Sequence, residues 1–264
     1  MERQAVLGRA IAAVGVVLAL VAIWVRFGDE NLDNGTYWDD GTFGALLLIL
    51  AVLAALALAG AIATGRRDYD VAVGVLGGVM FGLYLFVPAV FAPDQWDFLA
   101  AGAWLGLCSA LTFIGAALAT WPSDRAVARP PAVGALVAVV GLAIIVVGLF
   151  LDVESADLGS YWNLFGNGHS VGILMILLVV VVALSIAVAF SMALGTDAAV
   201  VLGAVTLGMA LYLPVLEAFD NLGDLRAGAW LTAIGAIVLV VGVAAMRHLA
   251  RAERPAAATA PPAA

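Results

Sequence analysis

Carboxylates and aromatic rings stand close together in two short stretches, a combination that could bind a ligand. Asp33 to Trp38 has the sequence DNGTYW, and Asp157 to Trp162 has the sequence DLGSYW. Such groups suit a cation, a sugar or a lipid headgroup. The Tyr-Trp pairs could instead anchor a loop on a bundle, because both residues favour membrane interfaces, and this is the simpler interpretation. The candidate binding residues here are Asp33, Tyr37, Trp38, Asp157, Tyr161 and Trp162.

Two further carboxylates, Asp94 and Asp220, lie in a stretch that the chain uses twice. Pro88 to Leu105 (PAVFAPDQWDFLAAGAWL) and Pro214 to Leu231 (PVLEAFDNLGDLRAGAWL) are identical at 9 of 18 positions, with a shift of 214 − 88 = 126 residues. An Asp at a helix start can accept hydrogen bonds from free backbone N–H groups. We expect Asp94 and Asp220 to cap the helices that follow, and a ligand site shared by the pair is the alternative.

Residues for other chemistry are sparse. His169 and His248 fall at opposite ends of the predicted bundle and cannot meet at one metal, and the single Cys108 lies in an apolar run. There is no glycine-rich phosphate loop and no nucleophile elbow. We therefore expect no catalytic residue, no metal, no cofactor and no nucleic-acid partner.

The elements that must position these residues are long apolar runs. The chain is 65% hydrophobic and 11% charged, with a mean hydropathy of +1.13. About 20 apolar residues in a helix cross the hydrocarbon core of a membrane. The sequence therefore predicts an all-α integral membrane protein with eight transmembrane helices, over residues 5–25, 43–64, 71–91, 99–120, 132–151, 171–194, 198–216 and 227–246.

The repeat and the linker divide these helices into two tandem four-helix modules. Residues 1–121 form the first module, 122–131 a cytoplasmic linker that ends in Pro130-Pro131, and 132–246 the second module. The Pro/Ala-rich residues 247–264 are expected to be a disordered cytoplasmic tail. An even number of spans gives both modules the same orientation, so they form a parallel repeat about a pseudo-two-fold axis along the membrane normal.

Arginines set the expected orientation. Nine of the 11 basic residues fall on one side of the eight-span arrangement, and only Arg26 and Arg226 fall on the other. The positive-inside rule then puts both termini in the cytoplasm. The chain lacks lysine and is rich in Ala, Gly and Val, a composition that suggests a bacterial protein. The outer face is acidic, with 13 of the 19 carboxylates.

Glycines recur at intervals of four and seven, which places them on single helix faces. Small residues on such faces let helix backbones approach closely, and we expect helix packing rather than hinges. The spaced glycines include Gly74, Gly78 and Gly82, then Gly134, Gly141 and Gly148, and finally Gly228, Gly235 and Gly242.

The central portions of the runs contain no charged residue. Coupled transporters usually carry one that faces a cavity. The leading interpretation is therefore a non-enzymatic scaffold or accessory subunit of the cell membrane, in contact with the lipid bilayer and with other membrane proteins. One alternative is a permease for a neutral or cationic small molecule, with its path between the two modules. Another is an enzyme that acts on lipid-linked substrates through outer carboxylates.

Overall fold

The structure is a computed structural model that describes residues 2–26, 35–39, 41–91, 99–120, 132–153, 159–162, 170–192, 197–216 and 225–258. Four of the predicted site residues, Asp33, Asp94, Asp157 and Asp220, lie outside these ranges. The other four, Tyr37, Trp38, Tyr161 and Trp162, lie within them.

Within the described ranges, the chain folds into eight helices. All eight are long and apolar enough to cross a membrane, which confirms the predicted class of an all-helical, multi-pass membrane protein. The helices are α1 (Glu2–Trp24), α2 (Thr42–Thr64), α3 (Arg67–Phe91), α4 (Ala101–Ala119), α5 (Ala132–Leu149), α6 (Ser170–Met192), α7 (Asp197–Leu216) and α8 (Ala227–Ala258).

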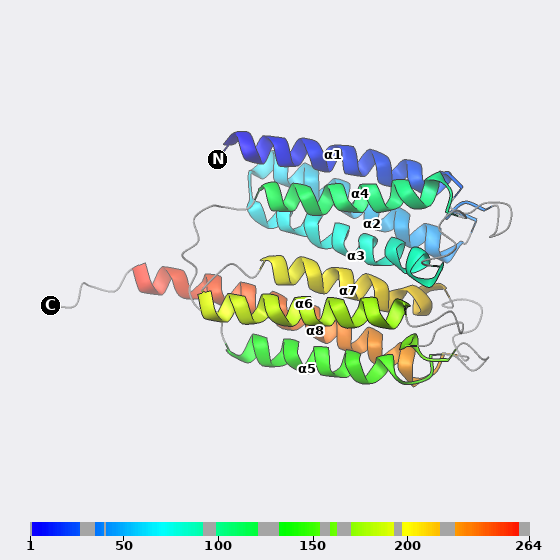
Figure 1. The fold of residues 1–264 in the computed structure, drawn as a ribbon. Coiled ribbons are helices and arrows are strands. Elements are labelled where there is room, and N and C mark those ends of the chain that lie inside the picture. Colours follow the sequence, from blue (N-terminus) through cyan, green and yellow to red (C-terminus); the bar gives the residue numbers. More distant parts are fainter. Residues whose placement is uncertain are drawn as a thin grey trace.

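The helices run up and down between two ends of an elongated bundle (Figure 1). Helix α1 begins and α8 finishes at the same end, which we call the terminal end. The opposite end carries Tyr37 and Tyr161, and we call it the tyrosine end. Helices α1–α4 lie on one side and α5–α8 on the other (Figure 1). The largest contacts within these groups join α1 to α4 and α5 to α8, and the largest contact between the groups joins α3 to α7.

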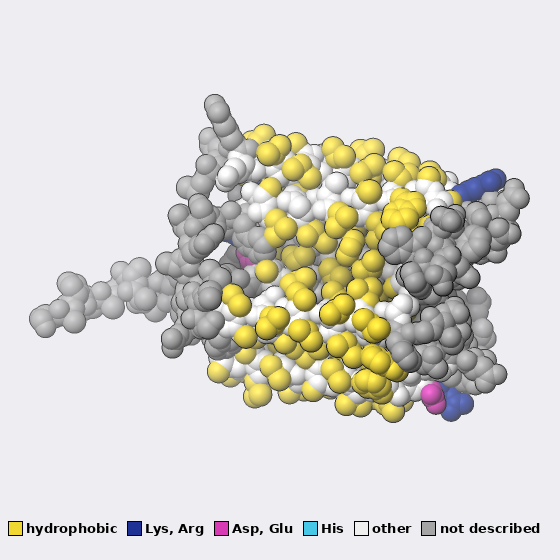
Figure 2. All heavy atoms as spheres, in the orientation of Figure 1, with side chains coloured by type: hydrophobic (Ala, Val, Ile, Leu, Met, Phe, Trp, Pro, Cys, Tyr) yellow, Lys and Arg dark blue, Asp and Glu magenta, His cyan; other side chains and the backbone are white. Residues whose placement is uncertain are grey.

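On the face of the bundle that Figure 2 shows, apolar side chains cover the surface between the two ends. Leu56 and Leu184, for example, are 62% and 58% exposed. Side chains this apolar would be costly to leave in water, whereas they match the hydrocarbon of a bilayer. Helices α3 and α7 are the most buried of the eight spans, because they lie where the two groups meet.

Two helix boundaries differ from the sequence prediction by at least four residues. The third helix was expected to begin at residue 71, but α3 already begins at Arg67. Asp68 and Asp70 lie in its first turn, where a negative charge is stabilised by the positive end of the helix dipole. Helix α8 continues through Ala258, so the expected disordered tail begins as helix. Ala and Arg are among the strongest helix formers, and they dominate this continuation.

The spaced glycines lie where helices touch, as predicted. A Cβ atom added at Gly235 of α8 would come within 2.8 Å of the Ile145 nitrogen and 2.9 Å of the Gly141 oxygen of α5. One added at Gly78 of α3 would lie 2.8 Å from the Val201 oxygen of α7. These are backbone atoms that cannot move aside alone, so glycine permits both helix contacts.

Candidate functional site

The two Tyr-Trp stretches form matching turns at the tyrosine end. Thr36 pairs with Arg26 in an isolated β-bridge, and Ser160 pairs with Asp152 in the same way. Both turns rest on a glycine of the next helix. A Cβ atom at Gly44 would be 2.7 Å from the Trp38 Cα, and one at Gly172 would be 2.7 Å from the Trp162 Cα.

The tyrosines of these turns point into the bundle rather than outward. Tyr37 and Tyr161 are each 1% exposed, whereas Trp38 is 41% exposed and packs on Trp24, with 4.8 Å between ring centroids. Trp162 packs in the same manner on Phe150, at 5.3 Å. These positions favour the anchoring interpretation for the tyrosines. Ligand binding by the eight candidate residues stays a prediction, since their four carboxylates lie outside the described ranges.

Asp39 closes the first turn, a role that the sequence pattern did not assign to it. Its Oδ2 accepts a hydrogen bond from the Thr36 backbone N–H at 2.7 Å and another from the Thr36 hydroxyl at 2.9 Å. Both bonds favour the ionised carboxylate and lower the pKa of Asp39. The side chain therefore stays charged while it fixes the loop beside Tyr37.

The starts of α4 and α8 are held by backbone groups. Gly102 N–H donates to the Arg26 carbonyl, and Gly228 N–H donates to the Asp152 carbonyl, both at 2.8 Å. The residue before α4 is Ala100, whose side chain makes no capping hydrogen bond. The prediction that Asp94 and Asp220 cap α4 and α8 stays a prediction, because both residues lie outside the described ranges. The close approach of the chain before each turn provides a carbonyl for the glycine N–H, and only a glycine leaves room for it.

Six buried or partly buried rings form a continuous row at the tyrosine end, which we call the aromatic seam. Tyr84 meets Tyr37 at 5.2 Å between centroids, Tyr37 meets Phe43 at 5.7 Å, and Phe43 meets Tyr212 at 5.2 Å. Tyr212 then stacks on Phe86 at 4.2 Å with an interplanar angle of 12°. Phe86 finally meets Tyr161 edge-on at 6.4 Å. The seam therefore joins the two turn tyrosines through the contact between α3 and α7.

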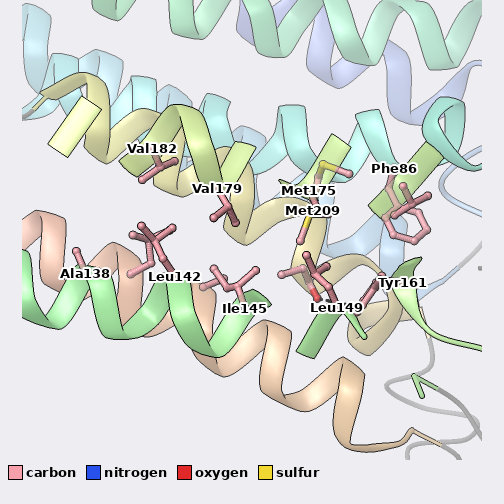
Figure 3. Close-up of a cluster of buried hydrophobic side chains, with 14 of the residues drawn as sticks. Phe86, Ala138, Leu142, Ile145, Leu149, Tyr161, Met175, Val179, Val182 and Met209 are labelled. Atoms are coloured by element: carbon pink, nitrogen blue, oxygen red, sulfur yellow. Dashed lines mark hydrogen bonds between the residues drawn. The ribbon is translucent and has the colours of Figure 1, made fainter. Parts of the chain in front are cut away.

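Figure 3 shows the part of this seam that lies in the α5–α8 group, where Phe86 and Tyr161 sit beside Met175 and Met209. Phe86 comes from α3 but belongs to the core of that group. Tyr212 of α7 packs on the cores of both groups. Both rings therefore contribute to the packing between the two groups.

Two tyrosine hydroxyls in the seam have different surroundings. The Tyr161 hydroxyl donates a long hydrogen bond of 3.5 Å to the Ala210 carbonyl, and burial raises the pKa of Tyr161 above its ordinary value. The Tyr84 hydroxyl is fully buried and has no hydrogen-bond partner among the described residues.

Ion pairs gather at the terminal end. Asp197 of α7 accepts hydrogen bonds from Arg67 of α3 at 2.9 Å and from Arg247 of α8 at 2.6 Å. Arg247 also pairs with Asp68 of α3 at 3.3 Å. We call these four residues the ionic cluster. They come from both groups, and the residues that pair with each other lie 50 to 179 positions apart in the sequence, so no local spacing could have revealed the pairs.

A second ion pair lies inside the α1–α4 group. The Arg9 guanidinium donates one hydrogen bond to each carboxylate oxygen of Asp70, both at 3.1 Å. The Arg9 side chain is only 18% exposed, and that of Asp70 is 8% exposed. They line a hollow of about 10 Å³, enough for roughly one water molecule, together with Leu58, Ala116 and Thr120. The sequence analysis did not pair these two residues, which lie 61 positions apart in the chain.

No family model, curated protein or solved structure matches this chain. The class to which it belongs therefore follows from its fold: a multi-pass membrane protein of eight apolar helices. Within the described part of the chain, no three His, Cys, Asp or Glu side chains converge in a metal-binding group. The arrangements that the structure does bring together are the aromatic seam, the ionic cluster and the Arg9–Asp70 pair.

Proposed function

We propose that this protein is a non-enzymatic scaffold or accessory subunit of the cell membrane, built from two copies of a four-helix module. The observation that carries the proposal is the closed contact between α3 and α7. Scaffolds hold one shape, whereas a permease with its path between the modules must open at this contact to admit a solute.

The contact between α3 and α7 is closed at three levels along the bundle. The ionic cluster ties the helices together at the terminal end. Farther along, a Cβ atom at Gly82 would lie 2.9 Å from the Gly208 Cα, so the backbones themselves touch. At the tyrosine end, Phe86 stacks on Tyr212. A further hydrogen bond of 2.6 Å runs from the Ser170 hydroxyl of α6 to the Ala89 carbonyl of α3. Together these contacts favour a fixed bundle.

Reciprocal contacts support the duplication. Gly82 faces the Val205 carbonyl, and Gly208 faces the Val79 carbonyl. Each residue of α7 here has its counterpart 126 residues earlier in α3, since 208 − 82 = 126 and 205 − 79 = 126, the shift of the sequence repeat. Phe86 and Tyr212, which stack on each other, are separated by the same 126 residues. Such mutual contacts are typical of a two-fold interface.

The orientation is part of the proposal, and labelling tests it. The arginine bias places the terminal end in the cytoplasm and the tyrosine end outside. In a Cys108→Ala background, Asp39→Cys should react with an impermeant thiol reagent in intact cells, because Asp39 is exposed at the tyrosine end. Arg66→Cys, exposed at the terminal end, should react only after the membrane is opened. The reverse pattern would overturn the orientation.

Function is tested in native membranes and in liposomes. When native membranes are solubilised in mild detergent, a scaffold should co-purify with a stoichiometric partner protein. Liposomes that contain the purified protein should take up neutral or cationic solutes no faster than empty liposomes. A protein that purifies alone and speeds solute uptake would contradict the proposal. If a covalent link between α3 and α7 then stopped that uptake, the permease would be the better account.

A further inference from the structure

We infer that the ionic cluster determines which module pairs with which: it makes the first module bind the second in preference to another copy of itself. This inference rests on the proposed duplication. The α3 surface of the first module binds the α7 surface of the second, and charges rather than shape make this pairing selective.

The problem that the cluster solves arises from the shape of the contact. The glycine and aromatic parts are reciprocal, with Gly82 against Gly208 and Phe86 against Tyr212. A reciprocal surface is self-complementary, so a module that presents it to its counterpart could also present it to its own copy. Shape and apolar packing therefore discriminate poorly between mixed and like pairs.

The charges at the terminal end break this symmetry. The counterpart of Asp197 in the first module is residue 197 − 126 = 71, which is Val71, an apolar residue that is 8% exposed. The counterpart of Arg247 is residue 247 − 126 = 121, which is Trp121. Neither counterpart can form an ion pair, so the pairs between the modules exist once rather than twice.

Among the described residues, two ion pairs join the modules, and each has one residue from the first module and one from the second. Arg67 of the first module reaches Asp197 of the second at 2.9 Å, and Asp68 of the first accepts from Arg247 of the second at 3.3 Å. If two first modules paired, Arg67 would meet Val71 where Asp197 now lies. If two second modules paired, Asp197 would keep Arg247 but lose Arg67. Partly buried charges that lose their partner are destabilising, so either like pair is disfavoured.

The full chain allows a direct test when a protease site is placed in the linker, residues 122–131. One version carries tag A at its N-terminus, and another carries tag B at its N-terminus and tag C at its C-terminus. Both are purified in detergent, checked as intact single species, cleaved and mixed. The mixture is warmed until tag C appears in the tag A pull-down, which shows that modules exchange partners. Tag B in the same pull-down then reports pairs of first modules.

We expect tag C to exceed tag B about tenfold in the wild type, the ratio that a preference of about 1.4 kcal/mol gives. Asp197→Asn and Arg67→Gln should each bring the ratio toward one. Arg66→Gln is the matched control, because it removes a charge at the same end whose ion pair is with Asp68 of its own module, and its side chain is 67% exposed. It should leave the ratio unchanged.

Equal recovery of tags B and C from the wild type would overturn the inference, and so would a ratio that Asp197→Asn and Arg67→Gln leave unaltered. Failure of the proposed fixed bundle looks different. In that case the modules would separate on cleavage, before any warming, and tag A would retrieve no second module at all.

Discussion

At the scale of single residues, the buried polar groups differ in whether a hydrogen bond compensates for their burial. Arg9 and Asp70 satisfy each other through two hydrogen bonds, whereas the Tyr84 hydroxyl is buried without a partner in the described part of the protein. A buried polar group without a hydrogen bond costs free energy, and its ring can still contribute through packing. We therefore expect that removal of the polar group changes the stability of the fold in opposite directions at the two sites.

Tyr84→Phe should leave the stability unchanged or raise it, by up to about 2 kcal/mol, because it removes a buried hydroxyl that has no partner among the described residues. Thermal unfolding in detergent measures the effect. Tyr84→Leu is the control for the ring, which Gly106 accommodates and which contacts Tyr37, and it should destabilise the fold. A clear loss of stability in Tyr84→Phe would mean that the hydroxyl does make a hydrogen bond.

Arg9→Leu should destabilise the protein by about 3 kcal/mol, because it leaves the Asp70 carboxylate buried without its cation. The double variant Arg9→Leu/Asp70→Leu removes both charges, and a buried pair replaced by apolar residues often costs little. We therefore expect the double variant to be more stable than Arg9→Leu alone in the same unfolding measurement. A double variant that is less stable than the single one would contradict this account of the pair.

At the scale of helices, glycine faces determine how close the backbones come. Gly82 of α3 and Gly208 of α7 contact each other directly. Along the contact between α5 and α8, each spaced glycine of one helix likewise lies against a glycine of the other. Gly115 of α4 offers a comparison within the same chain, because a Cβ atom there would meet nothing within 4 Å. The loss of stability on Gly→Ala substitution should therefore depend on whether the glycine lies at a helix contact, and not on which helix carries it.

Gly82→Ala should destabilise the protein by roughly 1–3 kcal/mol, since its Cβ would press on the backbone of α7 and force the helices apart. Gly115→Ala should be neutral or stabilise by up to about 1 kcal/mol, because Ala is the better helix former and the space is open. Thermal melts of the two variants side by side check this. Equal shifts in both would contradict close packing of α3 on α7.

The sequence predicted the helices well because each apolar run must satisfy its own backbone hydrogen bonds in lipid. The glycine spacing also predicted which helix faces are packed, but not which helix each face meets, since spacing carries no information about the partner. The burial of Tyr37 and Tyr161 was missed because Tyr suits both a headgroup layer and a core. The ionic cluster was missed because Arg67 and Asp197 are 130 residues apart and meet only in the folded bundle.

At the scale of the whole molecule, the protein is a multi-pass helical bundle whose two four-helix groups meet along α3 and α7. In the proposed pairing of the modules, this contact has two components. A reciprocal surface of glycines and stacked rings holds the groups together, and an asymmetric set of charges selects the mixed pair.

The most direct test of this account is a cross-link between positions 86 and 212. In a Cys108→Ala background, Phe86→Cys/Tyr212→Cys should be joined by a short bifunctional thiol reagent in native membranes, because the two rings stack at 4.2 Å. Trp104→Cys/Trp230→Cys is the control pair, since both side chains are 42% exposed on the outside of the bundle and should not be joined. After cleavage in the linker, the cross-linked chain should stay at full length on a denaturing gel. Two separate fragments from Phe86→Cys/Tyr212→Cys would contradict the closed contact between α3 and α7.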